Sequence, residues 1–407
     1  MLSNYKKLGD YIQPVNNRNK NLVDIPLLGV SIKKVLMPSI ANIIGTDMST
    51  YKLISKNQFA YGPVTSRNGD KISMALLEEH NGAMISQAYT VFEVIDEKKL
   101  LPEYLMMWFR RREFDRYARF KSHGSAREIF DWTEMCDTEL PIPSPEKQQE
   151  IIREYNIIQN RIALNNQLIT KLEETAQAIY KQWFVDFEFP DEKGRPYKSN
   201  GGEMVWCAEL EKEIPEGWEF KSLTKEVKLS GGGTPDTQNL DFWKGNIPFF
   251  TPADIDKDFF VFKTEKNITE NGLKGSSTKL YKKNTTFVTA RGTVGSIAIA
   301  GVEMAMNQSC YAIIGDFSFY THQLILSCMK QLKSEAIGAV FSALVTKDFD
   351  SQNIISPIIE IKEKFENKIS LIYDTIYFQT YENQKLAELK ELLLAKMTRV
   401  ESGKVSL

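Results

Sequence analysis

Several short segments of the chain contain residue types that could bind a metal ion. The four cysteines and three histidines could supply zinc ligands, but they are dispersed and form no Cys-x-x-Cys pair. The segment 190–193 reads Pro-Asp-Glu-Lys and carries two acids of a nuclease-like metal motif. Nuclease motifs place the first acid well upstream of the second, so we interpret this segment as a surface turn. No metal site is expected, and the thiols are predicted to be reduced and structural.

Phosphate, nucleotide and methyl-transfer chemistry would each need a glycine- or proline-rich loop. The segment 231–235 reads Gly-Gly-Gly-Thr-Pro, but proline donates no backbone N–H and no Gly-Lys pair follows, so a tight turn against another backbone is expected. The segment 402–405, Ser-Gly-Lys-Val, lacks the first glycine and the hydroxyl of an ATP-binding loop. An adenine methyltransferase loop would need a Pro-Pro pair, which the sequence lacks. We therefore expect no catalytic residues, and no binding of AdoMet or ATP by this chain.

Bulk properties limit the class of protein. A chain of 407 residues with 42% hydrophobic and 26% charged residues is typical of a soluble protein with two or three globular domains. Residues 1–12 include lysines and an aspartate, and the uncharged apolar stretch 336–345 is too short to cross a bilayer, so a cytoplasmic protein without a membrane segment is expected. The formal net charge of -2 means that binding to nucleic acid must depend on local basic patches.

The second half of the chain repeats the first at an offset of roughly 215 residues. The segment 52–57, Lys-Leu-Ile-Ser-Lys-Asn, matches 279–284, Lys-Leu-Tyr-Lys-Lys-Asn. Gln87 to Tyr89 matches Gln308 to Tyr311, and Phe130-Asp131 matches Phe349-Asp350. Each half ends at prolines that precede a long helical pattern. The sequence therefore predicts an internal pseudo-twofold repeat of one globular domain.

Two long segments carry heptad patterns of apolar residues, each with asparagine at one position of the stripe. Asn166-Gln167 and Asn383-Gln384 align the two segments with each other. Because each stripe needs a partner to leave water, we expect the helices to pack as an antiparallel coiled coil. Packing of each helix on its own domain is the alternative. The residues predicted to pair the helices and contact partners are Ile151, Tyr155, Ile158, Ile162, Asn165, Ile169 and Leu172, with Ile372, Ile376, Asn383, Leu386 and Leu393.

These patterns predict an α/β (α+β) protein with five parts. The parts are a globular domain at 1–143, a helix at 144–185, a linker at 186–217 rich in glycine and proline, a second globular domain at 218–357 and a second helix at 358–400. Within the domains, 285–288, 296–300 and 310–314 are expected to be strands, and 103–121 an amphipathic helix.

Basic residues gather at two places in these domains, where they could bind DNA phosphates while Asn, Gln, Ser or Thr contact base edges. In the first domain, a solvated helix face explains the same pattern equally well. The candidates in the first domain are Arg67, Lys71, Arg110, Arg111, Arg112, Lys121 and Arg127. Those in the second domain are Lys274, Lys279, Lys282, Lys283, Arg291 and Thr293.

In its order of motifs the chain resembles the specificity subunits of type I restriction-modification systems. The motifs are Ile214-Pro-Glu-Gly-Trp218, Ser230-Gly-Gly-Gly-Thr-Pro235, Ala290-Arg-Gly-Thr-Val-Gly295, Asn307-Gln-Ser309 and Leu392-Leu-Leu-Ala-Lys-Met397. The resemblance implies two target-recognition domains held apart by two helices, which read a bipartite DNA target with an unspecified spacer. It also implies two modification subunits that bind AdoMet and methylate adenine, and two restriction subunits that use ATP and Mg to cleave DNA.

The first half departs from the family pattern. Pro14 to Asn17 stands where the glycine turn is expected, and Tyr61 to Val64 precedes Arg67 in place of the arginine-glycine signature. Two domains that read different half-sites should diverge in this way. Two other functions stay open: a coiled-coil scaffold that does not touch DNA, and a fragment of a fused restriction-modification enzyme.

Overall fold

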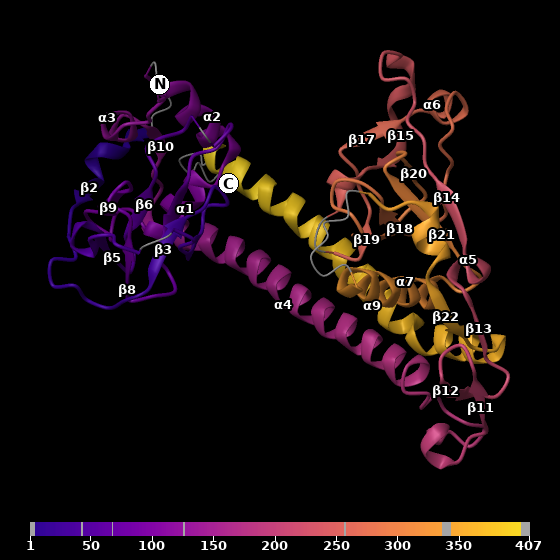
Figure 1. Cartoon of the computed structure of the whole chain (residues 1–407). Coiled ribbons are helices and arrows are strands. Elements are labelled where there is room, and N and C mark those ends of the chain that lie inside the picture. Colours follow the sequence, from indigo (N-terminus) through magenta and orange to yellow (C-terminus); the bar gives the residue numbers. More distant parts are fainter. Residues whose placement is uncertain are drawn as a thin grey trace, which may run out of the picture. The chain divides into compact units, whose positions relative to one another are not determined.

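The computed structural model describes residues 5–41, 44–66, 68–124, 127–255, 258–335 and 343–399. The chain forms two compact units (Figure 1): unit 1 comprises Met1–Ile162 and Lys385–Leu407, and unit 2 comprises Ala163–Gln384. Across the described ranges, no helix is both long and apolar enough to cross a membrane.

Unit 1 contains two four-stranded sheets and a two-stranded one. The sheets have the strand orders β2-β9-β6-β7, β4-β3-β8-β5 and β1-β10. The strands are β1 (Tyr5–Lys7), β2 (Ile12–Val15), β3 (Leu27–Val30), β4 (Leu36–Pro38), β5 (Lys52–Ser55), β6 (Phe59–Tyr61), β7 (Met74–Leu76), β8 (Gly82–Ile85), β9 (Thr90–Val94) and β10 (Glu139–Pro141). The helices are α1 (Pro102–Phe109), α2 (Arg112–Lys121), α3 (Trp132–Cys136) and the first part of α4 (Pro145–Phe184).

Unit 2 contains a five-stranded sheet, β14-β21-β18-β19-β16, a three-stranded sheet, β17-β15-β20, and the pairs β13-β22 and β11-β12. Its strands are β11 (Met204–Cys207), β12 (Lys212–Pro215), β13 (Glu219–Ser222), β14 (Lys228–Gly231), β15 (Trp243–Phe250), β16 (Phe260–Val261), β17 (Lys266–Ile268), β18 (Thr286–Thr289), β19 (Ile297–Ala300), β20 (Ala305–Met306), β21 (Cys310–Ile314) and β22 (Asn353–Ser356). Its helices are α5 (Leu223–Glu226), α6 (Glu270–Lys274), α7 (Ser318–Glu335), α8 (Thr346–Asp350) and most of α9 (Ile359–Lys396).

The two units repeat one topology. The order β2-β9-β6-β7 in unit 1 corresponds to β14-β21-β18-β19 in unit 2. The parallel pair β3-β8 corresponds to the parallel pair β15-β20. Asn57 and Asn284, which the sequence aligns, both have positive φ, at 66° and 69°. The predicted repeat is confirmed, and the expected strands at 285–288, 296–300 and 310–314 agree with β18, β19 and β21 within a residue or so.

The predicted stripe on α4 forms the contact between the long helices. Asn165 is 2% exposed, and its Nδ2 donates to Asn383 Oδ1 at 2.9 Å. Toward the other end of unit 2, the rings of Trp183 and Phe365 lie 5.6 Å apart, so α4 and α9 run antiparallel there. In unit 1, Lys390 donates to Gln159 of α4. The antiparallel pairing is therefore confirmed within each unit.

The correspondence of the two helices differs by three residues from the alignment of Asn166 with Asn383 expected from the sequence. The helices begin at Pro145 and Ile359, and buried residues coincide at this offset of 214, as in the pair Ile151 with Phe365. Asn383 and Asn166 are nevertheless in contact, because Asn383 Nδ2 donates to Asn166 Oδ1 at 2.7 Å. The pairing of Phe130-Asp131 with Phe349-Asp350 also needs correction: Asp131 caps the start of α3, whereas Phe349-Asp350 ends α8.

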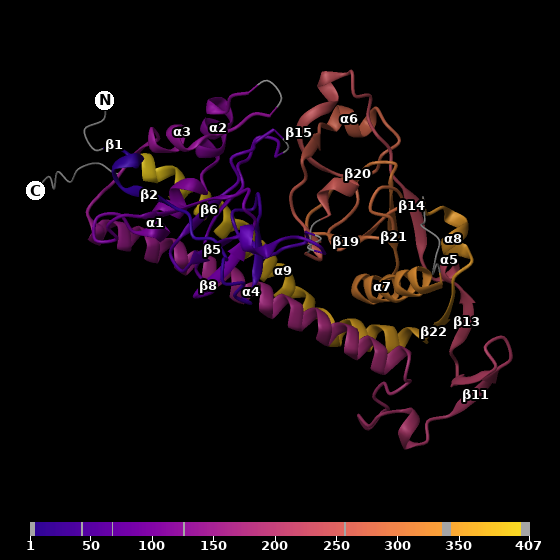
Figure 2. The same cartoon turned by 60° about the vertical axis from the view of Figure 1, so that its left-hand side comes forward.

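Helix α9 also packs on the globular part of unit 2, so both predicted modes of packing occur. The Tyr373 ring is stacked on Phe319 of α7, with centroids 4.2 Å apart. Its hydroxyl lies 2.6 Å from His322 Nδ1 and accepts from Gln323. Figures 1 and 2 show α7 beside α9 from two directions.

The segment 186–217, expected to be a connecting loop, is folded into the core of unit 2. Phe187 and Phe189 are 3% and 4% exposed and contact the Trp218 ring at centroid distances of 5.5 and 5.2 Å. The predicted surface turn at 190–193 is present, closed by an ion pair of 2.8 Å between Arg195 and Asp191. Contacts with aromatic rings stabilise a segment whose glycines and prolines suggested only a loop.

Candidate nucleic-acid interface

The glycine turn of unit 2 packs tightly against two other backbone segments. A Cβ atom on Gly232 would lie 2.1 Å from the carbonyl oxygen of Asn307, and one on Gly233 would lie 2.1 Å from Ser277 Oγ. The N–H of Gly233 donates to the carbonyl of Met306 at 3.1 Å. Only glycine fits at such distances, so the expected tight turn is confirmed.

This packing brings four loops of unit 2 together, at 231–235, 275–278, 290–295 and 307–309. Thr278 Oγ1 donates to the carbonyl of Met306 at 2.7 Å, and Ala290 N donates to the carbonyl of Ser309 at 2.7 Å. At the exposed end of the cluster, Thr234 Oγ1 donates to Gln308 Oε1. We call these four segments the loop cluster. Thr234 and Gln308 were absent from the predicted site, although the motifs that contain them were visible in the sequence.

The basic residues predicted for unit 2 do not all face the same surroundings. Lys274, Lys282 and Arg291 are exposed and form no ion pair within the part of the chain that the structure describes. Lys279 Nζ lies 3.4 Å from Ser230 Oγ beside the glycine turn. Lys283 Nζ instead lies 3.6 Å from the centroid of the Tyr377 ring on α9, a cation–π contact.

Thr293 is exposed in the arginine-glycine turn of the loop cluster. Its carbonyl accepts a hydrogen bond from the Thr289 hydroxyl, which fixes the turn. Gly292 and Gly295 have φ of 78° and 71°, a conformation that favours glycine. The turn thus holds the backbone that presents Arg291.

In unit 1 the basic run expected on one amphipathic helix is divided, because the helix is interrupted at residues 110 and 111 between α1 and α2. Helix α1 ends at Phe109, so the next three arginines point to different places. Arg110 forms an ion pair with Glu78 at 3.6 Å, and Arg112 forms one with Glu391 at 3.6 Å. Arg111 is 5% exposed, and its guanidinium lies 4.1 Å from the centroid of the Trp108 ring.

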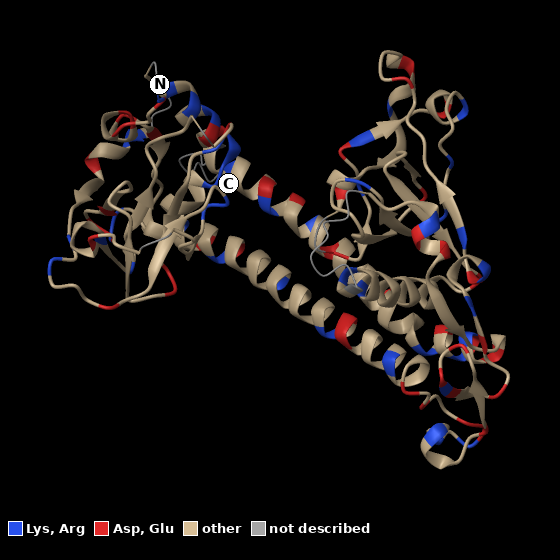
Figure 3. Cartoon of the chain, viewed as in Figure 1, with Lys and Arg blue, Asp and Glu red and all other residues tan. Residues whose placement is uncertain are grey.

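The remaining basic candidates of unit 1 are also separated. Lys121 forms an ion pair with Glu134 at 3.2 Å, which raises the lysine pKa. Lys71 and Arg127 are exposed, and Arg67 lies outside the described residues. Figure 3 shows acidic residues among the basic ones in unit 1.

The thiols and imidazoles show no metal-binding arrangement in the described ranges. No group of three or more His, Cys, Asp or Glu residues there could hold a metal ion. The cysteines are free, and burial raises the pKa of Cys310 and of Cys328 to about 12. Burial lowers the pKa of His322 to about 3, so its imidazole is neutral at pH 7.

Comparison with known proteins agrees with this architecture. The model of the type I restriction modification DNA specificity domain matches residues 24–174 and 215–391. The chain is 25% identical to the type I restriction enzyme HindI specificity subunit of Haemophilus influenzae, over 98% of this chain and all of that protein. It is also 25% identical to the MjaIX specificity subunit of Methanocaldococcus jannaschii, over 75% of this chain and 70% of that protein.

A solved structure has the same fold over nearly the whole chain. The crystal structure of the type I restriction-modification S subunit from M. genitalium has a TM-score of 0.56 at 12% identity, with 98% of this chain and 96% of that chain covered. Each of the two matched regions covers most of one copy of the repeat. The chain therefore belongs to the family of type I restriction-modification DNA specificity subunits.

Proposed function

We propose that this chain reads a bipartite DNA target with an unspecified spacer, one half-site by each unit. The observation that carries the proposal is the presence of two copies of one fold whose loops differ: unit 2 has the Gly231–Gly233 turn, whereas unit 1 has Asn16-Asn17-Arg18, just after β2, at the corresponding place. A shared fold with different loops suits two domains that recognise different DNA half-sites. It has no evident use in a scaffold that does not touch DNA.

The loop cluster of unit 2 has the chemistry for both kinds of DNA contact. Exposed Arg291 within the cluster, and exposed Lys282 four residues beyond its segment 275–278, could bind phosphates, which position the protein on the duplex. The exposed hydroxyl of Thr234 and amide of Gln308 could donate to and accept from base edges. We therefore assign DNA contact in unit 2 to this cluster.

Replacing Arg291 and Lys282 together by alanine should weaken DNA binding and flatten its salt dependence. Each lost phosphate contact should lower the slope of log K against log salt by about 0.9. Fluorescence anisotropy of the assembled methyltransferase on a target duplex, measured at several salt concentrations, would report this. Lys283→Ala is the matched control, because Lys283 contacts the Tyr377 ring and should leave the slope unchanged. An unchanged slope in the double variant would refute the assignment of DNA contact to the loop cluster. A complex that assembles but has no affinity for DNA would favour the scaffold function.

We further propose that the chain has no catalytic role and works with two modification and two restriction subunits. AdoMet, ATP and Mg would be bound by those subunits, and adenine methylation and cleavage would occur there. Support comes from apolar side chains left exposed on the long helices in unit 2: Leu164 and Leu168 on α4 are 57% and 41% exposed, and Leu371 and Phe378 on α9 are 74% and 63% exposed. Such exposed stripes are typical of interaction surfaces. The cytoplasmic location stays a prediction from the sequence.

Replacing Leu164 and Leu168 by glutamate should weaken binding of the modification subunit by at least about tenfold, because two charges would be buried at an apolar contact. Both positions are exposed in the chain, so its folding should be kept. Isothermal titration calorimetry with the purified modification subunit would measure the loss. Thr170→Glu with Gln177→Glu is the control, since it adds the same charge at exposed polar positions of α4. Equal affinity for both double variants would exclude this face of α4 from the contact.

A further inference from the structure

Unit 1 contains a pocket of about 520 Å³ lined by aromatic rings and a buried arginine. Tyr5, Trp108, Phe114 and Tyr117 line it together with Arg111, and Thr398, just after the end of α9, closes one side. The Tyr5 and Trp108 rings meet edge to face at 6.4 Å. Its volume is that of a small-ligand site, and the function proposed for the loops makes no use of it.

Two hydrogen-bond donors in this pocket have no acceptor in the part of the chain that the structure describes. Trp108 and Arg111 are 6% and 5% exposed, and neither the indole Nε1 nor the arginine Nε has a partner among the described residues. The Arg111 guanidinium is stacked on the indole, and within the described ranges its Nη2 alone approaches a carboxylate, that of Glu113 at 3.4 Å. Buried donors are nearly always satisfied in proteins. An acceptor supplied from outside the described chain would satisfy both groups.

Charge around the pocket selects for a neutral group. Carboxylates and basic side chains there are joined in ion pairs: Asp137 with Lys7 at 2.9 Å, and Glu113 with Arg111 and Arg116. Glu139 also lies at the pocket. An added anion would be repelled by these carboxylates, and an added cation would be repelled by Arg111.

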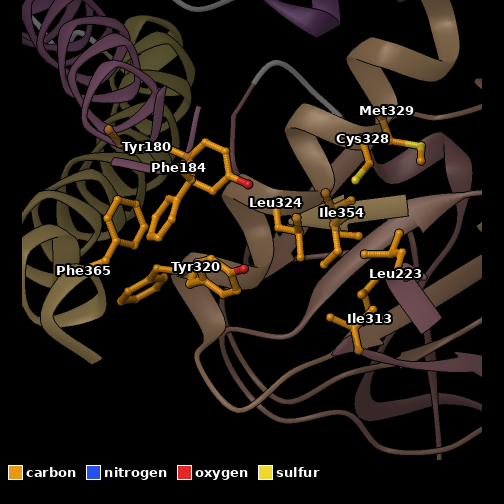
Figure 4. Packing of buried hydrophobic residues seen from close by; sticks show 14 of the residues in the cluster. Tyr180, Phe184, Leu223, Ile313, Tyr320, Leu324, Cys328, Met329, Ile354 and Phe365 are labelled. Carbon is orange, nitrogen blue, oxygen red and sulfur yellow. The ribbon is translucent and has the colours of Figure 1, made fainter. Parts of the chain in front are cut away.

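The internal repeat indicates what kind of group fits. The long helices begin at Pro145 and Ile359, an offset of 214, at which Thr398 corresponds to Phe184 at the end of α4. Phe184 is 6% exposed, and its ring packs at centroid distances of 4.8 Å on Phe365 and 5.0 Å on Tyr180. Figure 4 shows this ring beside Tyr180 in the core of unit 2. The helix end in unit 2 thus supplies an aromatic ring, whereas in unit 1 a threonine stands at that position and the pocket is open.

We propose that this pocket receives an aromatic side chain of the bound modification subunit, a tyrosine or phenylalanine ring with a neutral acceptor beside it. The acceptor, a phenol oxygen or a main-chain carbonyl, takes the N–H groups of Trp108 and Arg111. The identity of the partner rests on the proposed function. The preference of the pocket for a neutral ring does not rest on the proposed function. The preference and the identity of the partner are tested separately.

The pocket is tested on the full chain alone with N-acetyl-L-tyrosine amide as the probe. The tryptophans are labelled as 5-fluorotryptophan, and the Trp108 signal in the fluorine NMR spectrum is assigned with Trp108→Phe. The probe should shift this signal saturably, and Thr398→Tyr, which places an aromatic ring where unit 2 has Phe184, should lower the affinity at least about tenfold. Thr398→Ser should bind as the wild type does. If Thr398→Tyr does not fold, Arg111→Met should show a weakened affinity in its place.

Other outcomes would overturn the proposal. These are no saturable shift, equal affinity in Thr398→Tyr, or tighter binding of N-acetyl-L-tyrosine with its free carboxylate. Binding only by a chain that ends at Arg399 would mean that residues 400–407 occupy the pocket. For the partner, adding the modification subunit should displace the probe. If the complex forms and the probe stays bound, the occupant is not that subunit, whereas a complex that fails to form counts against the proposed function alone.

Discussion

Inserting four residues into both long helices should lengthen the unspecified spacer of the DNA target by one or two base pairs and leave both half-sites unchanged. The insertions belong between Ile162 and Ala163 in α4 and between Gln384 and Lys385 in α9, where the helices pass from one unit to the other. Four residues add about 6 Å of helix at ~1.5 Å per residue, and DNA rises ~3.4 Å per base pair. Methylome sequencing of cells that carry the variant would report the new spacer.

The periodicity of the helices makes this insertion tolerable. Four residues return the apolar stripe close to its original face. Seven residues make two full turns of a coiled-coil helix, at ~3.5 residues per turn, and return the stripe closer still. Inserting seven residues into each helix should therefore lengthen the spacer further, by about three base pairs at ~3.4 Å each.

A matched control places four residues after Lys193, in the exposed turn closed by Asp191 and Arg195. This insertion leaves the long helices intact and should leave the spacer unchanged. An active complex with the helix insertions and the original spacer, or with altered half-site bases, would contradict the idea that the helices set the spacing.

The long helices were predictable from sequence because their signal is local. The period of Ile151, Tyr155 and Ile158 depends only on helix geometry, and all three are buried as expected. The strand pattern of the repeat was predictable for the same reason. The correspondence of the two helices was not, because a shift of three residues, close to one helical turn, hardly changes the local periodicity, and the helix starts at Pro145 and Ile359 are what distinguish the two alignments.

The candidate site was harder to predict because its geometry depends on long-range contacts. Thr234 and Gln308 are 74 residues apart in sequence and meet only because the glycine turn packs on the backbone at 306–307. Arg111 looks like a surface charge in sequence, yet stacking on Trp108 buries it. The basic run of unit 1 was expected on the face of one helix, and the division between α1 and α2 gives its three arginines different neighbours.

Replacing Trp218 by alanine should be among the most destabilising substitutions in unit 2, at about 3–5 kcal/mol, the usual cost of truncating a buried aromatic ring. Trp218 is 5% exposed, and its ring lies within 5.9 Å of Phe184 and nearer still to Phe187 and Phe189. It joins the end of α4 and the segment 186–217 to the first strand of the repeated domain. Its loss leaves a cavity at the point where all three meet.

The matched control is Trp206→Ala, because Trp206 lies on β11 of the same segment and is 66% exposed. This change should stay within about 0.5 kcal/mol of the wild type. Hydrogen exchange followed by mass spectrometry on the full chain would separate the units: Trp218→Ala should lower the protection of peptides from the β14-β21-β18-β19-β16 sheet, while peptides from the β2-β9-β6-β7 sheet keep theirs. Uniform loss in both sheets would mean that the two units unfold as one. Protection like that of Trp206→Ala would mean that the aromatic cluster contributes little to the stability of unit 2, and that 186–217 could be the flexible linker that its glycines and prolines first suggested.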